Sequence, residues 1–152
     1  MEQQSSRELR RRLRKTAAIL VEDSSVRAEL TDEQGKELIK WGMDLIEAEA
    51  AQTADLPDEG AMPLLEEKTT AVRTTMLLVN KLVRPGDSEE DTDDQLTRLL
   101  KNLTWVTKRP SGLAHLRRVE KFKKHREAMS QEEAFRLLMD MLQLDVVSDE
   151  EE

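Results

Sequence analysis

The sequence predicts an all-α protein, a compact bundle of five to six amphipathic helices. Leucine dominates the apolar residues, with 22 Leu against 12 β-branched Val and Ile, and leucine loses little rotamer freedom in a helix. The 152 residues include only five Gly and four Pro, which is few for the turns of a β-sheet fold. Short sequences that start helices also recur along the chain.

Three segments match the capping box, in which a Ser or Thr hydroxyl and a Glu or Gln side chain each bind a backbone N–H at a helix start. They begin at Thr31, Thr92 and Ser130, and Ser5 begins a weaker fourth match. Acidic residues accompany these boxes, where the positive end of the helix dipole favours them. We therefore expect helices to start after Thr31, Thr92 and Ser130.

The first helix is expected over residues 6–21, because Leu13 and Leu20 fall on one face with helical spacing. The second is expected over 32–53, directly after the first strong capping box. Its apolar residues, among them Leu38, also recur every three to four positions. A connection between the two helices fits a short turn.

The third helix is expected over residues 63–83, because proline is well suited to the first position of a helix and Pro63 stands there. The fourth is expected over 93–108 and has the most regular apolar stripe, with Leu99 and Leu103 at its centre. The connections before these two helices are then the two longest loops.

The fifth helix is expected over residues 113–128, with Leu113 and Leu116 on its inner face. Arg126 falls at the edge of that apolar face, where its long stem would let the charge reach water. The sixth helix is expected over 131–144.

Composition places this chain among soluble proteins with a single domain. Cysteine is absent, which removes disulfides and thiolate metal sites, and no apolar run approaches a membrane span. We expect one helical domain over residues 1–145, a frayed acidic tail over 146–152, and a cytoplasmic location. The hydrophobic fraction of 38% predicts a thin core, which leaves room for a homo-oligomer or a stable protein partner.

The net charge of −8 hides an alternation of basic and acidic blocks. Residues 7–15 hold six basic residues and one acidic residue, and residues 96–128 hold ten basic and two acidic. By contrast, residues 87–94 hold six acidic residues and no basic one, and residues 129–152 hold eight acidic and one basic. The two basic blocks are the candidate binding segments, and together they can form one surface.

On the fifth helix five of the basic residues fall within an arc of roughly 120°, whereas Lys123 and Arg126 fall on the apolar side. A basic face of this kind fits an acidic protein surface or a phosphate backbone. The competing interpretation is a solvated helix face whose charges are balanced by acidic segments of the same fold. The candidate partner-binding residues of the two blocks are Arg10, Arg11, Arg12, Arg14, Lys15, Arg117, Arg118, Lys121, Lys124 and His125.

The sixth helix is apolar around most of its circumference. It either lies in the core or presents a methionine-bearing face to a partner. The candidate contact residues for such a partner are Leu138, Met141 and Leu142.

Motifs for catalysis or metal binding are weak. Residues 55–66 resemble a calcium loop only in part, because Pro57 stands where a side-chain oxygen is needed. His115 and His125 are too far apart on one helix to share a metal, and we expect both to lie on the solvated basic side. A carboxylate cluster at Asp44, Glu47 and Glu49 lacks the Glu-x-x-His pairs of di-metal bundles. We therefore predict no catalytic residue, metal or cofactor.

These observations favour a non-enzymatic interaction protein, such as an adaptor, a regulator or a small subunit of a larger assembly. It would dock partners through separate basic and acidic surfaces. The alternative is a small helical subunit that contacts nucleic-acid phosphates within a ribonucleoprotein or a DNA-bound complex. Net acidity and an aromatic content of only 3% make a free-standing nucleic-acid binder less suitable.

Overall fold

A computed structural model of the chain describes residues 2–84, 89–108 and 112–144. These residues form six α-helices and two short 3-10 turns, and they include no β-strand, so the predicted all-α fold is confirmed. The elements in chain order are α1 (Glu2–Glu22), η1 (Ser24–Arg27), α2 (Asp32–Gln52), α3 (Asp58–Leu82), α4 (Glu89–Thr107), α5 (Leu113–His125), η2 (Arg126–Ala128) and α6 (Gln131–Gln143).

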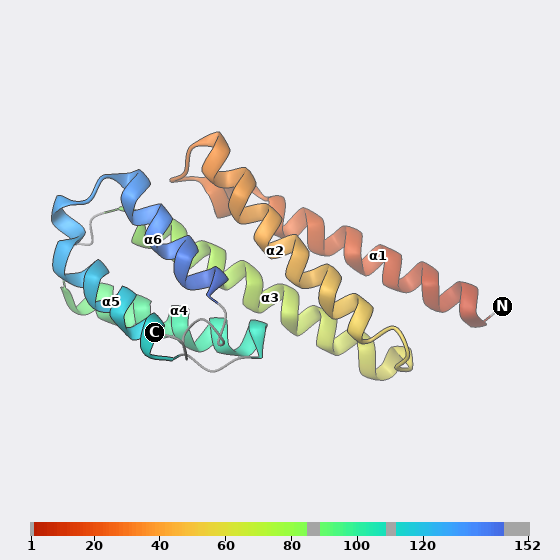
Figure 1. Cartoon of the computed structure of the whole chain (residues 1–152). Coiled ribbons are helices and arrows are strands. Elements are labelled where there is room, and N and C mark those ends of the chain that lie inside the picture. Colours follow the sequence, from red (N-terminus) through yellow and green to blue (C-terminus); the bar gives the residue numbers. More distant parts are fainter. Residues whose placement is uncertain (1, 85–88, 109–111, 145–152) are drawn as a thin grey trace.

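The long helix α3 is the centre of the bundle (Figure 1). It packs against α1, α2, α4 and α6 and against the turn η1. Helices α1, α2 and α3 run alongside one another, whereas α4, α5 and α6 gather around one end of α3. The N-terminal end of α1 projects beyond the other helices at the opposite end of the molecule.

The core lies along α3 and is closed by α6. Val72, Met76 and Val79 of α3 are completely buried, as are Phe135 and Leu138 of α6. Burying such side chains contributes about 1.5–3 kcal/mol each relative to leaving them exposed. The stripe predicted for the fourth helix also packs into this core.

Helices α2 and α3 approach each other closely at Gly42. A Cβ atom at this position would lie 3.0 Å from Val72 Cγ1 and 3.1 Å from Met76 Sδ. The glycine therefore serves close packing here, although glycine inside a helix has an entropic cost.

Two of the three predicted capping boxes are present. Thr31 Oγ1 accepts from the Gln34 N–H at 3.2 Å, and the Gln34 side chain accepts from the Thr31 N–H at 3.1 Å. Ser130 and Glu133 form the same pair of bonds at the start of α6. The box at Thr92 is wrong: α4 begins three residues earlier, at Glu89.

Pro63 does not start a helix. Helix α3 begins at Asp58, with Pro57 at its N-cap, and Pro63 lies within its second turn. The acidic residues Asp58 and Glu59 occupy the first turn, where the helix dipole favours them. Because most of the segment 55–66 is therefore helical, it does not have the form of a calcium-binding loop.

Candidate functional site

Cationic side chains close the C-terminal ends of four helices. The last carbonyl groups of a helix have no intrahelical partner and carry the negative end of the helix dipole, so a cation there satisfies both. In each case the cation comes from another segment of the chain. The contacts are Arg73 to Leu20 at the end of α1, Arg10 to residues 53–56 after α2, Arg126 to Leu82 and Val83 at the end of α3, and Lys68 to Val106 at the end of α4.

Arg10 holds the end of α2 and the start of α3 together. Its Nη1 donates to the carbonyl oxygens of Thr53 and Ala54, both at 3.0 Å, and its Nη2 donates to that of Leu56. Its Nε pairs with Asp58 Oδ1 at 3.2 Å, and its side chain is only 14% exposed. Arg10, which was predicted to bind a partner, thus uses its guanidinium in hydrogen bonds within the fold.

Arg126 points into the protein, and the prediction that it reaches water is wrong. Its Nε donates to Leu82 O at 3.3 Å, Nη2 donates to Val83 O, and Nη1 donates to Met129 O at 3.4 Å. The guanidinium also lies 5.8 Å from the Phe122 ring centroid. Only 8% of the residue is exposed, and this burial lowers the pKa of the guanidinium.

Lys68 and Glu49 form a buried charged group next to the end of α4. Lys68 Nζ donates to Val106 O, and burial lowers the pKa of Lys68 despite the nearby Glu49 carboxylate. Lys108, whose φ of 58° ends α4, pairs with Glu49 at 3.4 Å. Fixed charges here connect α2, α3 and α4.

The carboxylates at 44, 47 and 49 do not converge on a metal site. Asp44 pairs with Lys40 at 2.8 Å within α2, and Glu47 Oε2 lies 3.7 Å from Arg14 Nη1. Glu49 instead pairs with Lys108 as described. In the described ranges, no three acidic or histidine side chains are placed to bind one metal ion.

The other basic residues of α1 are exposed, except for Arg14, which is half-buried and lies 3.7 Å from Glu47 of α2. Arg11 and Lys15 are exposed and form no ion pair with the part of the chain that the structure describes. Arg12 pairs weakly with the exposed Glu8, at 3.3 Å, one helical turn away. We call the set Arg7, Arg11, Arg12, Arg14 and Lys15 the α1 basic surface.

A second basic surface lies on α5. Arg118 is half-buried and donates from Nη1 to Ala114 O at 3.1 Å, so part of its guanidinium is used in a contact within α5. The exposed members are Arg117, Lys121, Lys124 and His125, which we call the α5 basic surface.

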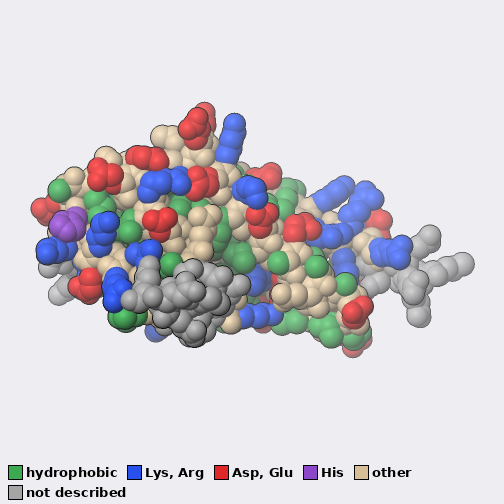
Figure 2. Space-filling model, in the orientation of Figure 1, with side chains coloured by type: hydrophobic (Ala, Val, Ile, Leu, Met, Phe, Trp, Pro, Cys, Tyr) green, Lys and Arg blue, Asp and Glu red, His purple; other side chains and the backbone are tan. Residues whose placement is uncertain are grey.

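The two surfaces do not combine into one, contrary to the prediction from sequence. Helix α5 and the projecting part of α1 lie at opposite ends of the molecule (Figure 1). In Figure 2, basic side chains gather over α1 at one end and beside α5 at the other, with acidic and further basic side chains intermixed between them. A compact ligand therefore meets only one of the two surfaces.

Apolar residues on α5 and α6 also differ from expectation. Leu113 and Leu116 were expected inside, yet they are 54% and 53% exposed because α5 turns Ala114, Val119 and Phe122 into the core instead. Leu138, Met141 and Leu142 of α6 are almost completely buried. The fold thus leaves these three residues no surface to offer a partner.

The two histidines have different environments. His115 is buried, and its Nδ1 accepts a hydrogen bond from the Gly112 N–H at 3.3 Å. It therefore helps to start α5 and does not lie on a solvated face as predicted. His125 is exposed at the other end of the helix.

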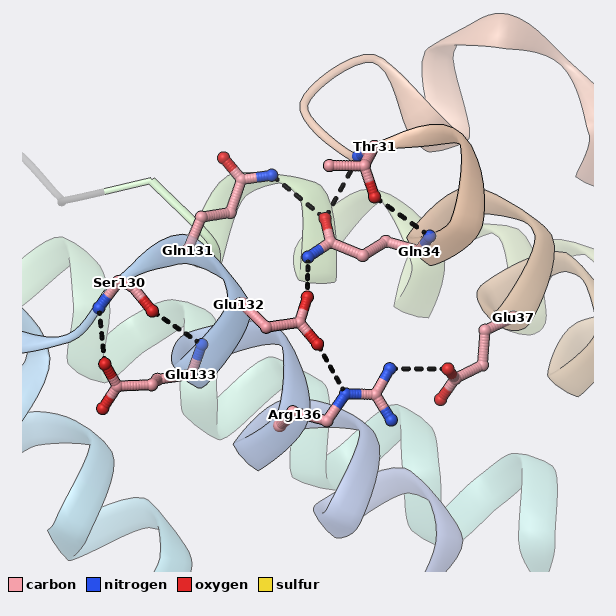
Figure 3. Close-up of polar contacts among 8 residues, drawn as sticks. All are labelled: Thr31, Gln34, Glu37, Ser130, Gln131, Glu132, Glu133 and Arg136. Carbon is pink, nitrogen blue, oxygen red and sulfur yellow. Dashed lines mark hydrogen bonds and ion pairs between the residues drawn. The ribbon is translucent and has the colours of Figure 1, made fainter.

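A polar junction joins the starts of α2 and α6 (Figure 3). Buried Gln34 donates from Nε2 to Glu132 Oε2 at 2.5 Å and accepts from Gln131 Nε2 at 3.1 Å. Arg136 then bridges Glu132 and Glu37, and the two carboxylates raise its pKa. Sequence reasoning found both capping boxes but missed that they face each other, since only the tertiary fold brings residues 34 and 131 together.

An open hollow lies between α2 and the end of α6. Its two carboxylates are already ion-paired, Glu37 with Arg136 and Asp44 with Lys40, so it provides no arrangement of a nucleophile and a base. The residues that line it are Glu37, Lys40, Trp41, Asp44, Leu45 and Gln143.

Within the described ranges, every helix is too short or too polar to cross a membrane. Comparison with known proteins gives no match: no family model, no curated protein and no solved structure is significantly similar to this chain. Inferences about function therefore depend on the chain's own residues.

Proposed function

We propose that this protein is a non-enzymatic adaptor, regulator or small subunit that docks acidic protein partners, with the α1 basic surface as its principal site. The observation that supports this most directly is the exposure of Arg11 and Lys15, which have no ion pair in the described part of the chain. Arg10, which directly precedes Arg11 in the sequence, instead points into the fold. The cations of one short segment therefore divide into structural and exposed residues.

The exposed cations have a cost for the isolated fold. Arg7, Arg11 and Lys15 follow one another at intervals of four residues, so they are neighbours on the helix surface. Like charges at this spacing destabilise a helix by about 0.2–0.5 kcal/mol per pair. An anionic partner would relieve this repulsion, and it would also be attracted from a distance, which raises the association rate.

Protein is a better match than nucleic acid for this surface. The chain carries a net charge of −8, which opposes the approach of an extended polyanion. Single strands also require several aromatic stacking platforms, whereas Trp41, Phe122 and Phe135 are buried and only Trp105, at 46% exposed, is at the surface of the described residues. The acidic side chains beside the basic surfaces restrict binding to a partner of limited footprint.

The test uses two matched double variants of the full chain. Arg11→Glu/Lys15→Glu reverses two charges on the α1 basic surface, and Lys36→Glu/Lys40→Glu makes the same change at the same spacing on exposed positions of α2. Proteins retained by wild type from native-host extract are identified, purified and measured for binding at low and high salt.

The proposal expects an acidic partner whose affinity falls with salt and is lost only in the α1 variant. It fails if the same partners bind both variants equally. A labelled 20-base-pair DNA duplex and a single strand of equal length are measured in parallel. The nucleic-acid alternative would be supported instead if the duplex or the single strand bound more tightly than any protein partner and if the α1 variant lost that binding.

We include a cytoplasmic location in the proposal, and imaging of a fluorescent fusion tests it.

A further inference from the structure

The outward face of α5 has an apolar half followed by a basic half. Leu113 and Leu116, in the first turn and just after it, are 54% and 53% exposed. Lys121 and Lys124 follow on the same outward side and are also exposed, with Arg117 between the two halves. This order fits an acidic segment that begins with apolar residues, because each half then meets a complementary group.

Helix α6 ends on the same side of the α5–α6 pair as the side on which this face begins. The short turn η2 connects α5 to α6, and the two helices pack together, so α6 runs back past α5 (Figure 1). The end of α6 at Gln143 and the start of α5 at Leu113 consequently lie on the same side of the pair.

Residues 145–152 follow α6 and lie outside the described residues. Their sequence is Asp-Val-Val-Ser-Asp-Glu-Glu-Glu, so two valines precede four consecutive acids. At about 3.3 Å per residue, eight extended residues reach about 26 Å. The 13 residues of α5 span about 20 Å at 1.5 Å per residue. The extended segment is therefore longer than α5, and the difference leaves about 6 Å for the step from the end of α6 to the face.

We propose that residues 145–152 dock along α5 in the same chain, with Val146 and Val147 on the exposed leucines and residues 149–152 on the α5 basic surface. Three properties of residues 145–152 match this face of α5: the order of apolar and acidic residues, the length and the negative charge. A tethered segment has an effective concentration in the millimolar range, so weak contacts suffice to hold it. This inference deepens the proposed function, since an acidic partner at α5 would first have to displace the segment.

The experiment is zero-length carbodiimide cross-linking of the full chain, which joins a carboxylate to a lysine amine in direct contact. Trypsin then gives a peptide of residues 137–152, whose links are mapped by mass spectrometry. The Lys40–Asp44 pair, at 2.8 Å within α2, serves as an internal standard for yield. An equal mixture of ¹⁴N and ¹⁵N protein distinguishes links within one chain from links between two.

The proposal expects links from residues 149–152 to Lys121 and Lys124 within one chain, with a yield that falls when salt is raised. Val146→Ser/Val147→Ser retains every reactive group, yet it should lower that yield about tenfold because the apolar contact is lost. Lys36→Glu, which removes an exposed lysine of α2 and keeps the Lys40–Asp44 standard, should leave this link unchanged.

Three results would overturn the proposal: links spread over distant lysines, links between chains of different isotope, or a yield that the serine variant does not change. The last would mean that tethering alone brings the charges together. The cross-linking experiment contains no partner protein. A negative cross-linking result therefore does not contradict partner docking at α1, and a negative docking result does not contradict a cross-link between residues 149–152 and α5.

Discussion

Arg126 donates from Nε to the carbonyl oxygen of Leu82 at 3.3 Å and so closes the end of α3 from a position 44 residues later in the chain. The same guanidinium also contacts Val83 O and Met129 O. A single side chain thereby ties α3 to the turn between α5 and α6. Arg10, Lys68 and Arg73 do the same for other helix ends, so these four cations have structural roles.

Replacing Arg126 tests this structural role. Arg126→Met keeps much of the apolar stem but leaves buried carbonyl groups without donors, so we expect a loss of about 2–4 kcal/mol in the free energy of unfolding. Arg98→Met is the matched control, because Arg98 makes only an exposed pair with Asp94, and it should change stability by at most about 0.5 kcal/mol. Urea denaturation measures both. Equal stability of the two variants would contradict the assignment.

The capping boxes give a second prediction, because two similar sequences have different structures. Thr31→Ala removes a cap and should cost about 1 kcal/mol. Thr92→Ala lies inside α4, where alanine is a good helix former, and should change stability by less than about 0.5 kcal/mol. Thermal and urea unfolding of the two variants compares them directly. A loss at Thr92 as large as that at Thr31 would mean that α4 starts at Thr92 after all.

Lys68 predicts a particular pH dependence. Its pKa is lowered in the folded state by burial, with Glu49 opposing and Lys108 adding to the shift, so the unfolded chain binds its proton more tightly. The contribution of Lys68 to stability must therefore rise with pH between this lowered pKa and the ordinary value of 10.5. The sequence contains no Tyr or Cys to titrate in the same range.

The measurement is the difference in unfolding free energy between wild type and Lys68→Met from pH 7 to 10.5. We expect the difference to move in favour of wild type as pH rises, while other lysines cancel. A pH-independent difference, or one that moves the other way, would show that Lys68 is not held in a buried position.

The helices were predictable from sequence because their determinants are local. Periodic leucines and the boxes at Thr31 and Ser130 identify helices through contacts three or four residues apart. The start of α3 was missed because Pro63 is also tolerated within the second turn of a helix whose acidic first turn contacts Arg10. That contact joins residues 48 positions apart, and no local pattern reveals it.

The candidate site was predictable only as a set of charges. The sequence shows that residues 10–15 are basic, but the direction of each side chain depends on what α1 packs against. Arg10 meets the end of α2, whereas Arg11 meets solvent. Leu113 was expected in the core but is exposed, and Arg126 was expected to reach water but is buried. Both differences arise because Ala114 and Phe122 pack into the core and so fix the rotation of α5 about its axis.

Adjacent Arg10 and Arg11 have opposite roles, one inside the fold and one at the surface, and a paired measurement distinguishes them. Unfolding free energy and affinity for the purified acidic partner are measured for Arg10→Met and for Arg11→Glu/Lys15→Glu. Arg10→Met should lose about 1–3 kcal/mol of stability and retain affinity below its unfolding transition. The α1 double variant should keep its stability within about 0.5 kcal/mol and lose affinity about tenfold or more. The account is contradicted if the double variant binds like wild type, or if Arg10→Met is as stable as wild type.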